Sequence, residues 1–286
     1  MYVATCESSD WRTRYVPKVL LGPIRYWHLR SSALVASLKD LWVPPKAGEV
    51  SLPLPPPLLR YRVHGQLDSD TFVTVGRNCA RDLMRSLTVI GKNLYACENI
   101  LDFGCGCARV LRYFHDHPES CHFVGTDIDP EAITWCRSRL PFATFGVNDR
   151  LPPLPFPAAT FDLIYGVSVF THLDEDYQLA WLNELRRVAK PGGTLMLSVH
   201  GTYAQAIASQ ERIFATGDLE TLGDKGFLFQ VLETGRFKRD GLPDFYQCAF
   251  HTERYVRETW SEFFTVQDYV ERGINDHQDL VLLTRR

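Results

Sequence analysis

Residues 102–108, Asp-Phe-Gly-Cys-Gly-Cys-Ala, constrain the fold of this chain more than any other part of its sequence. They follow the short apolar run 99–101 and precede a helical pattern, so we expect a strand, a tight turn and a helix. Glycine at positions 104 and 106 lets the backbone turn sharply and lets a ligand approach without meeting a Cβ. The positive end of the expected helix would face the same ligand. Such a turn can also be purely structural, so the residues around it decide between the two interpretations.

A second strand that ends in an acid follows about 20 residues later, the spacing expected in a nucleotide-binding βαβ unit. Residues 122–127 form a largely apolar run that ends at Asp127. A carboxylate at this point can accept hydrogen bonds from both hydroxyls of a ribose. Asp129 and Pro130 are typical of the N-cap and the first position of a helix. The two motifs together predict a site for a ligand that contains a ribose.

Residue 109 distinguishes two classes of nucleotide-binding protein. The fingerprint of nicotinamide-dependent oxidoreductases is G-x-G-x-x-G or G-x-G-x-x-A, and its third small residue allows close packing of helix on strand. Here that position holds Arg109, and the small residue comes one position earlier, at Ala108. The pattern from Asp102 to Ala108 resembles the first motif of class I S-adenosylmethionine-dependent methyltransferases, usually D/E-x-G-x-G-x-G. Ala108 is a mild departure, because glycine is commonest there.

The resemblance to this family continues in the same order as far as about residue 200. It implies a Rossmann-like α/β fold, in which a seven-stranded sheet carries helices on both faces, and S-adenosylmethionine as the cofactor. The other segments that carry the resemblance are a third strand with an adenine-contacting loop (145–149 and 151–156), a fourth strand with the loop over the methyl-transfer site (161–173), a helix (179–190) and a fifth strand (194–199). Two more strands are expected near the C-terminus.

The resemblance also implies a set of cofactor-binding residues. The glycine turn and the acids supply most of them, and the loops after the third and fourth strands supply the others. We expect the cofactor to contact Asp102, Gly104, Cys105, Gly106, Asp127, Ile128, Asn148, Asp149 and Ser168.

Two segments outside these motifs complete the expected organisation. Residues 1–68 form an N-terminal extension, where six prolines between positions 44 and 57 exclude a regular helix and indicate an extended strap. Residues 69–286 form the methyltransferase domain and begin with a helix over about 69–90. Residues 201–250 are an insertion before the last two strands. We expect this insertion to cap the carboxyl ends of the strands and to bind the methyl acceptor.

The composition and charge of the chain limit the classes of partner that it is expected to bind. Its 286 residues carry a net charge of −3 at pH 7, so no global positive field favours nucleic acid. No apolar run is long enough to span a bilayer, and the first ten residues lack the apolar centre of a signal peptide. The eight cysteines are scattered, and no second pair completes a metal site with Cys105 and Cys107. We expect a cytoplasmic protein with reduced cysteines, no metal and no nucleic-acid or membrane partner. The sequence leaves both a monomer and a homodimer open.

Methyl transfer requires few catalytic groups from the protein, because the sulfonium of the cofactor already activates the methyl carbon. Alignment of a nucleophile for in-line attack can contribute roughly 7–11 kcal/mol at best. A hydroxyl acceptor also needs a base, and histidine is the side chain best tuned for this near neutral pH. Topology selects four of the nine histidines as candidates near the ligand-binding edge of the sheet: His172 after strand four, His200 at the end of strand five, His251 after the insertion and His277 between the last two strands. Each of them can instead be structural or bind the substrate.

We therefore expect S-adenosylmethionine-dependent transfer of a methyl group to an oxygen or nitrogen of a small molecule, such as a natural product or a sugar. Residues 165–168 replace the Asn/Asp-Pro-Pro-Tyr/Phe turn of adenine methyltransferases, and the Pro-Cys pair of cytosine-C5 enzymes is absent there. Two alternatives stay open. One is an NAD(P)-dependent oxidoreductase with a Rossmann-type fold, and the other is a non-catalytic module that binds the cofactor without turnover.

Overall fold

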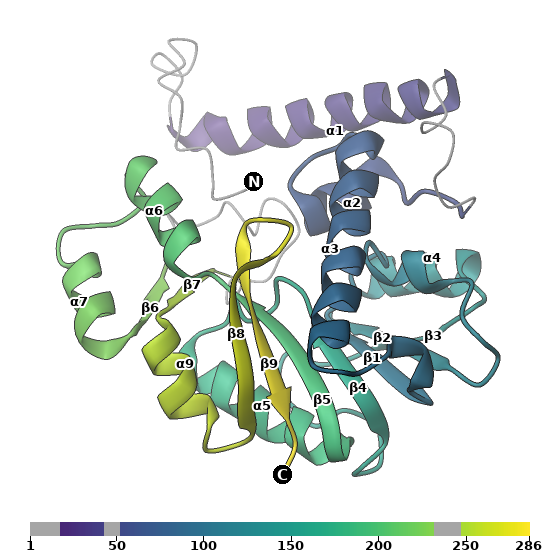
Figure 1. The fold of residues 1–286 in the computed structure, drawn as a ribbon. Coiled ribbons are helices and arrows are strands. Elements are labelled where there is room, and N and C mark those ends of the chain that lie inside the picture. Colours follow the sequence, from purple (N-terminus) through teal and green to yellow (C-terminus); the bar gives the residue numbers. More distant parts are fainter. Residues whose placement is uncertain (1–17, 43–51, 232–246) are drawn as a thin grey trace.

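The sheet at the centre of the computed structural model has seven strands in the order β3-β2-β1-β4-β5-β9-β8 (Figure 1). The structure describes residues 18–42, 52–231 and 247–286. The first five strands run parallel, and β9 is antiparallel to both of its neighbours. The strands are β1 (Asn99–Phe103), β2 (His122–Asp127), β3 (Thr144–Val147), β4 (Phe161–Gly166), β5 (Ala189–Val199), β8 (Thr265–Ile274) and β9 (Gln278–Thr284). The expected seven-stranded α/β sheet is confirmed.

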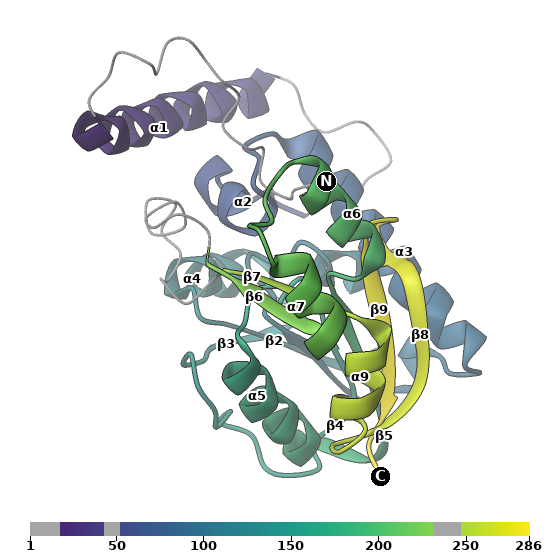
Figure 2. The same cartoon turned by 90° about the vertical axis from the view of Figure 1, so that its left-hand side faces the viewer.

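Helices cover both faces of the sheet, because successive side chains of a strand point to opposite faces and both sets are apolar. Along β5, Met196 packs into one layer, whereas Leu195 and Leu197 pack into the other. The two layers lie on opposite sides of the strands (Figure 2). One contains α3 (Ser69–Val89), α4 (Pro130–Arg139) and the 3₁₀ helices η2 (Leu94–Ala96) and η3 (Leu111–Phe114), and the other contains α5 (Glu175–Val188) and α9 (Glu253–Trp260).

The start of α4 follows the local signals in the sequence. The Asp129 carboxylate accepts hydrogen bonds from the backbone nitrogens of Glu131 (3.0 Å) and Ala132 (3.2 Å). Pro130 occupies the first helical position, where its missing N–H costs no hydrogen bond. This cap confirms the predicted boundary and fixes the chain immediately after the end of β2.

The α-helix expected after the glycine turn is absent from the described structure, so that prediction was wrong. Residues 107–110 form turns, and only the four-residue η3 follows them. Ala108 has a φ of 58°, a left-handed conformation that a right-handed helix cannot contain. The segment also lies tightly against α3, since a Cβ on Gly76 would come within 2.2 Å of the Arg109 carbonyl oxygen. Packing of a distant helix therefore decides the path of the chain here.

Two other boundaries differ from the expected ones. β5 begins at Ala189, so Pro191, Gly192 and Gly193 lie within the strand and the pairing with β4 is irregular there. His251 is the last residue of β7 rather than the opening of a helix. The helix begins two residues later, because the Thr252 hydroxyl accepts from the backbone nitrogen of Tyr255 (3.2 Å) and caps α9.

The insertion before the last two strands contains α6 (Thr202–Gln210), α7 (Asp218–Lys225) and an antiparallel pair, β6 (Phe227–Gln230) with β7 (Cys248–His251). Residues 232–246 lie outside the described residues. The backbone nitrogen of Ala249 donates to the carbonyl oxygen of Thr171 (2.8 Å), and that of His251 donates to His200 (2.9 Å). These bonds hold the insertion against the segments that follow β4 and β5.

Two helices precede α3 in the described part of the chain, α1 (Lys18–Trp42) and α2 (Pro57–His64). The sequence did not predict α2, which Pro57 opens at its first turn and Gly65 ends with a φ of 72°. The buried Arg60 joins the two helices through Asp40 (2.7 Å) and donates to the Pro55 carbonyl (2.8 Å). Among the described residues, no helix is both long and apolar enough to cross a membrane.

Candidate functional site

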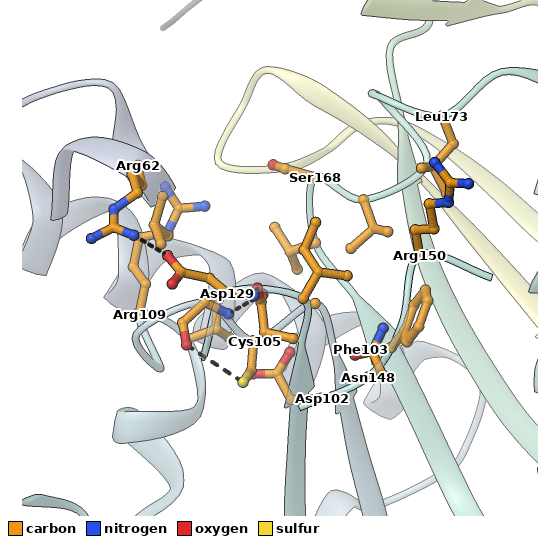
Figure 3. A pocket seen from close by; sticks show the side chains of 18 of the residues that line it. Arg62, Asp102, Phe103, Cys105, Arg109, Asp129, Asn148, Arg150, Ser168 and Leu173 are labelled. Atoms are coloured by element: carbon orange, nitrogen blue, oxygen red, sulfur yellow. Dashed lines mark hydrogen bonds and ion pairs between the residues drawn. The ribbon is translucent and has the colours of Figure 1, made fainter. Parts of the chain in front are cut away.

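A cavity of about 330 Å³ opens at the carboxyl ends of β1, β2 and β4 (Figure 3). Parallel strands bring their following loops together at this edge, where ligands bind in open α/β sheets. Much of the wall is apolar, with Val63, Phe103, Ile128, Val169 and Leu173 among its side chains. The size and the apolar lining are typical of a site for a small organic molecule.

Most of the residues expected to bind a cofactor come together around this cavity. Asp149 is not among the lining residues, and its carbonyl oxygen instead accepts from the Asn148 amide at 2.8 Å. The expected residues that do line the cavity are Asp102, Gly104, Cys105, Gly106, Asp127, Ile128, Asn148 and Ser168.

The glycine turn passes through conformations that favour glycine. Gly104 has a φ of 75° and Gly106 a φ of 54°. A Cβ on Gly104 would lie 2.3 Å from Val169 Cγ2, and one on Gly106 would lie 2.5 Å from Val63 Cγ2. Both positions therefore require glycine for backbone conformation and for space at the wall of the cavity.

Asp127 lies at the end of β2 and is held by the turn it faces. Its Oδ2 accepts from the backbone nitrogen of Gly106 (2.7 Å), and its Oδ1 accepts from that of Asp129 (2.8 Å). A carboxylate offers about four lone pairs, so each oxygen can accept one more hydrogen bond from a ligand. Burial raises the pKa of Asp127 to about 6 despite these backbone donors, so the group is mainly ionised at neutral pH.

The loop after β3 supplies a polar atom that has no hydrogen-bond partner in the part of the chain that the structure describes. Asn148 is buried, and its Oδ1 has no hydrogen-bond partner among the described residues. Such an orphan acceptor is costly unless a ligand or water donates to it. It offers an acceptor suited to the amino group of an adenine. Trp181 closes this side of the cavity and donates its indole N–H to the Arg150 carbonyl oxygen (3.1 Å).

The N-terminal helix α2 forms a wall of the cavity that the sequence did not reveal. Arg62 and Val63 line the cavity, and Arg62 forms ion pairs with Asp129 (2.8 Å) and with Glu131. These pairs join α2 to the start of α4 across about 70 residues of sequence. Pro57 was a local signal for the start of α2, but no pattern indicated which surface the helix covers.

Three of the four candidate histidines form a cluster beside the insertion. The ring centroid of His200 lies 6.1 Å from that of His172 and 6.3 Å from that of His277. None of the three lines the cavity described above. Ser168 connects the two regions, since it lines the cavity while its hydroxyl contacts Gln278, the residue after His277 (3.1 Å).

All three clustered imidazoles are neutral at pH 7. Burial lowers the pKa of His172 and of His277 to about 4. Burial, followed by the neighbouring imidazoles, moves the pKa of His200 well below its usual range. His251 lies apart from these ring contacts: it is fully buried, and its Nε2 hydrogen-bonds to the Gln178 side-chain oxygen at 2.9 Å.

The order of the sheet, the glycine turn and the acid at the end of β2 are typical of class I S-adenosylmethionine-dependent methyltransferase domains. Residues 100–193 match the family model of a methyltransferase domain. An uncharacterized methyltransferase of Schizosaccharomyces pombe is 28% identical over 117 residues. That match covers 37% of this chain and 41% of the yeast protein, so the chain matches less than half of its relative's length.

Solved structures share the fold at low sequence identity. The PH0226 protein from Pyrococcus horikoshii OT3 is 18% identical, with a TM-score of 0.52, over 79% of this chain and 98% of that one. The 1,6-didemethyltoxoflavin-N1-methyltransferase of Burkholderia thailandensis, with bound 1,6-didemethyltoxoflavin and S-adenosylhomocysteine, is 16% identical with a TM-score of 0.51. It aligns over 84% of this chain and 96% of its own. These likenesses concern the fold.

The residues around the cavity fit S-adenosylmethionine. The Asp127 carboxylate has acceptor capacity for ribose hydroxyls, and Asn148 has an unpartnered acceptor for an adenine amine. The glycine turn removes two Cβ atoms that would otherwise fill space at the wall.

Replacement of Asp127 by alanine is expected to weaken binding of S-adenosylmethionine by about 1.5–3 kcal/mol, the range for loss of a charged hydrogen-bond partner. Calorimetric titration of the folded variant measures this loss. Unchanged affinity would show that the Asp127 side chain does not contribute to cofactor binding.

The same residue should make cofactor affinity depend on pH. Ribose hydroxyls donate to the ionised carboxylate, so affinity should be level above pH 6 and fall by up to about tenfold per unit below it. Asp102 stays protonated over this window, because burial raises its pKa to about 8. An Asp127→Asn variant is the control and should show a flat profile between pH 5 and 7, values chosen to bracket that pKa. An equal decline in that variant would assign the pH dependence to another group.

Proposed function

We propose that this chain transfers a methyl group from S-adenosylmethionine to an oxygen or nitrogen of a small molecule. The observation that carries the proposal is the convergence of the glycine turn, Asp127 and Asn148 on one cavity at the carboxyl edge of the sheet. When bound there, the cofactor supplies an electrophilic methyl group on its sulfonium. The protein's part is to hold both reactants in line and to receive a proton where the acceptor carries one.

The sheet favours this function over the nicotinamide-dependent alternative. A dinucleotide-binding Rossmann sheet has the strand order 3-2-1-4-5-6. Here the antiparallel β9 lies between β5 and β8, and Arg109 occupies the position where the dinucleotide fingerprint needs a small residue. Both features support a cofactor without a pyrophosphate.

We propose that the acceptor binds between the cofactor cavity and the insertion formed by α6, α7, β6 and β7. The insertion is held to the segments after β4 and β5 by the backbone bonds of Ala249 and His251. The histidine cluster lies at this junction and is linked to the cavity through Ser168 and Gln278. A polar acceptor entering here would meet imidazole nitrogens rather than a wholly apolar wall.

His200 is the member of the cluster best placed to receive a proton. Its Nδ1 donates to the Ala249 carbonyl oxygen (3.2 Å), which fixes the tautomer and leaves Nε2 as the acceptor nitrogen. His172 and His277 lie on either side of it. Because His200 is neutral, it can take the proton of a hydroxyl acceptor as the new bond to the methyl carbon forms. With an ammonium acceptor it would take the proton before the attack, which frees the nitrogen lone pair that bonds to the methyl carbon.

The charge of the chain supports a small molecule rather than a nucleic acid as the acceptor. Its net charge of −3 gives no broad positive field, and a small-molecule methyltransferase is among the proteins that share its fold. In the described part of the chain, no three His, Cys, Asp or Glu side chains are grouped as metal ligands would be.

Titration calorimetry with three ligands tests the proposed function. S-adenosylmethionine and S-adenosylhomocysteine should each bind at one site, whereas NAD and NADP should produce no heat of binding. Transfer of labelled methyl groups to a library of small hydroxyl and amine compounds then tests catalysis. Binding of NAD in place of S-adenosylmethionine would reinstate the oxidoreductase, and cofactor binding without transfer would favour the non-catalytic module.

A further inference from the structure

Arg109 lies at the cofactor cavity, at the position that excluded the dinucleotide fingerprint. It follows the glycine turn directly and is 8% exposed. It lines the cavity together with Arg62 and Val63 of α2. Figure 3 shows Arg62 and Arg109 on one side of the pocket and Arg150 and Leu173 on the other. A long cationic side chain therefore occupies one end of the cavity.

Within the described part of the chain, Arg109 forms no ion pair with an acidic side chain. Its charge acts on Asp102, which also lines the cavity, but burial raises the pKa of that carboxyl to about 8, so Asp102 is mainly protonated at pH 7 and does not compensate the charge. The Nη1 of Arg109 lies 3.3 Å from Nδ1 of His64, and its Nε is buried without a hydrogen-bond partner. No Asp or Glu oxygen of the described residues lies within 4.0 Å of its guanidinium nitrogens. A guanidinium does not lose its proton in a protein, and a buried charge without a counter-charge is costly.

His64 holds Arg109 in place but contributes no negative charge. Burial, reinforced by the Arg109 charge, lowers the pKa of His64 to about 4, so the imidazole is neutral. Its Nδ1 accepts from Arg109, and its Nε2 therefore donates to the Thr71 hydroxyl at 2.8 Å. Thr71 in turn donates to Asp68, the N-cap of α3, at 2.6 Å. This chain of hydrogen bonds orients the guanidinium at the wall of the cavity.

Arg62 provides the contrast on the same side of the cavity. Its guanidinium is paired with the carboxylates of Asp129 and Glu131, so its charge is already compensated. Of the two neighbouring cations, Arg109 is therefore the one that an anionic ligand group would stabilise.

We propose that Arg109 binds the carboxylate at the amino-acid end of S-adenosylmethionine, an inference that rests on the proposed function. Asp127 and Asn148 come from the ends of β2 and β3 and suit the ribose and the adenine, whereas Arg109 follows β1 on the side of α2 and α3. The carboxylate is the one anionic group of this cofactor. Arginine presents a planar fork of donors that matches a carboxylate, and the bond is strong where water is excluded.

A pair of ligands that differ only in the carboxylate tests this assignment. S-adenosylhomocysteine and its decarboxylated analogue, S-adenosyl-3-thiopropylamine, are titrated calorimetrically into the full chain and into an Arg109→Met variant. The variant should bind S-adenosylhomocysteine roughly 10- to 100-fold more weakly, the effect of one lost charge-assisted contact, and should bind the analogue with nearly unchanged affinity. The Arg109→Lys variant keeps the charge but not the planar fork of donors. Its affinity for S-adenosylhomocysteine should lie between those of the wild-type chain and Arg109→Met, and its affinity for the analogue should be nearly unchanged.

Arg62→Met is the matched control, because it removes an arginine from the same wall. It should change the affinities for the two ligands by the same factor, since Arg62 acts by holding α2 to α4. Equal weakening of both ligands by Arg109→Met would show that Arg109 only supports α2. A carboxylate-selective loss in Arg62→Met instead would transfer the site to Arg62. A wild-type chain that binds neither ligand would contradict the proposed function itself, whereas selective loss in Arg109→Met would confirm the carboxylate assignment and the binding of the cofactor.

Discussion

Replacement of Gly106 by valine is expected to abolish detectable binding of S-adenosylmethionine while the circular dichroism spectrum stays that of a folded α/β protein. Gly106 has a φ of 54°, which is unfavourable for residues with a Cβ and most of all for a β-branched one. The new Cβ would also lie 2.5 Å from Val63 Cγ2 at the wall of the cavity. The backbone nitrogen that orients Asp127 would shift with it. We expect affinity to fall by two orders of magnitude or more, about 2.7 kcal/mol.

Gly91 provides a matched control for this substitution. It has a φ of 71°, so valine there carries a similar backbone strain, but nothing lies within 4 Å of the added Cβ. Gly91→Val should therefore lose some stability and keep its affinity for the cofactor. Gly104→Val should behave as Gly106→Val does, because its Cβ would lie 2.3 Å from Val169. Normal binding by both turn variants would show that the glycine turn serves the fold alone.

Replacement of His200 by alanine is expected to lower the rate of methyl transfer by roughly 10²- to 10⁴-fold, the usual contribution of a general base. The affinity for S-adenosylhomocysteine should change little, because His200 does not line the cofactor cavity. Removal of a group that acts only in the transition state lowers kcat without a matching loss of cofactor binding. The acid limb of the pH–rate profile should also disappear, since the rate would no longer require a neutral imidazole.

His172→Ala, His277→Ala and His251→Ala complete the series, and His122→Ala, at an exposed position on β2, is the control. A selective loss of rate in His172→Ala or His277→Ala would move the role of base to that imidazole. His251→Ala should mainly lower stability, because it leaves the buried Oε1 of Gln178 without its histidine partner. Near-normal rates in all four variants would mean that alignment alone drives catalysis, and an amine that arrives neutral would then be the better acceptor.

Much of the fold could be predicted because its signals are local. Asp129 and Pro130 specify the start of α4 through a side-chain cap and a preset φ, and the structure has both. The apolar runs that became β1, β2, β4 and β5 end at the same edge of the sheet, so Asp102, Asp127 and Ser168 meet at one cavity. Their positions in the chain, combined with a parallel sheet, were enough to bring them together.

Other features depended on contacts between segments that are distant in the sequence. The helix expected after the glycine turn fails at Ala108, because the chain there follows the surface of α3 at Gly76. The four histidines looked equivalent along the chain. Packing buries His251 on Gln178 and gathers the other three around His200.

The sequence itself determined the order of the strands and the class of cofactor, through motifs of a few residues each and their resemblance to a known family. The role of Asp127 at the ribose stays a prediction from the same motifs. Only the tertiary structure decided what surrounds those residues. It brought α2 over the cavity through the Arg62 ion pairs and left Arg109 without an ion-pair partner among the described residues. The physical reason is that burial and charge compensation depend on which distant side chains come within a few ångströms, and no local pattern records that.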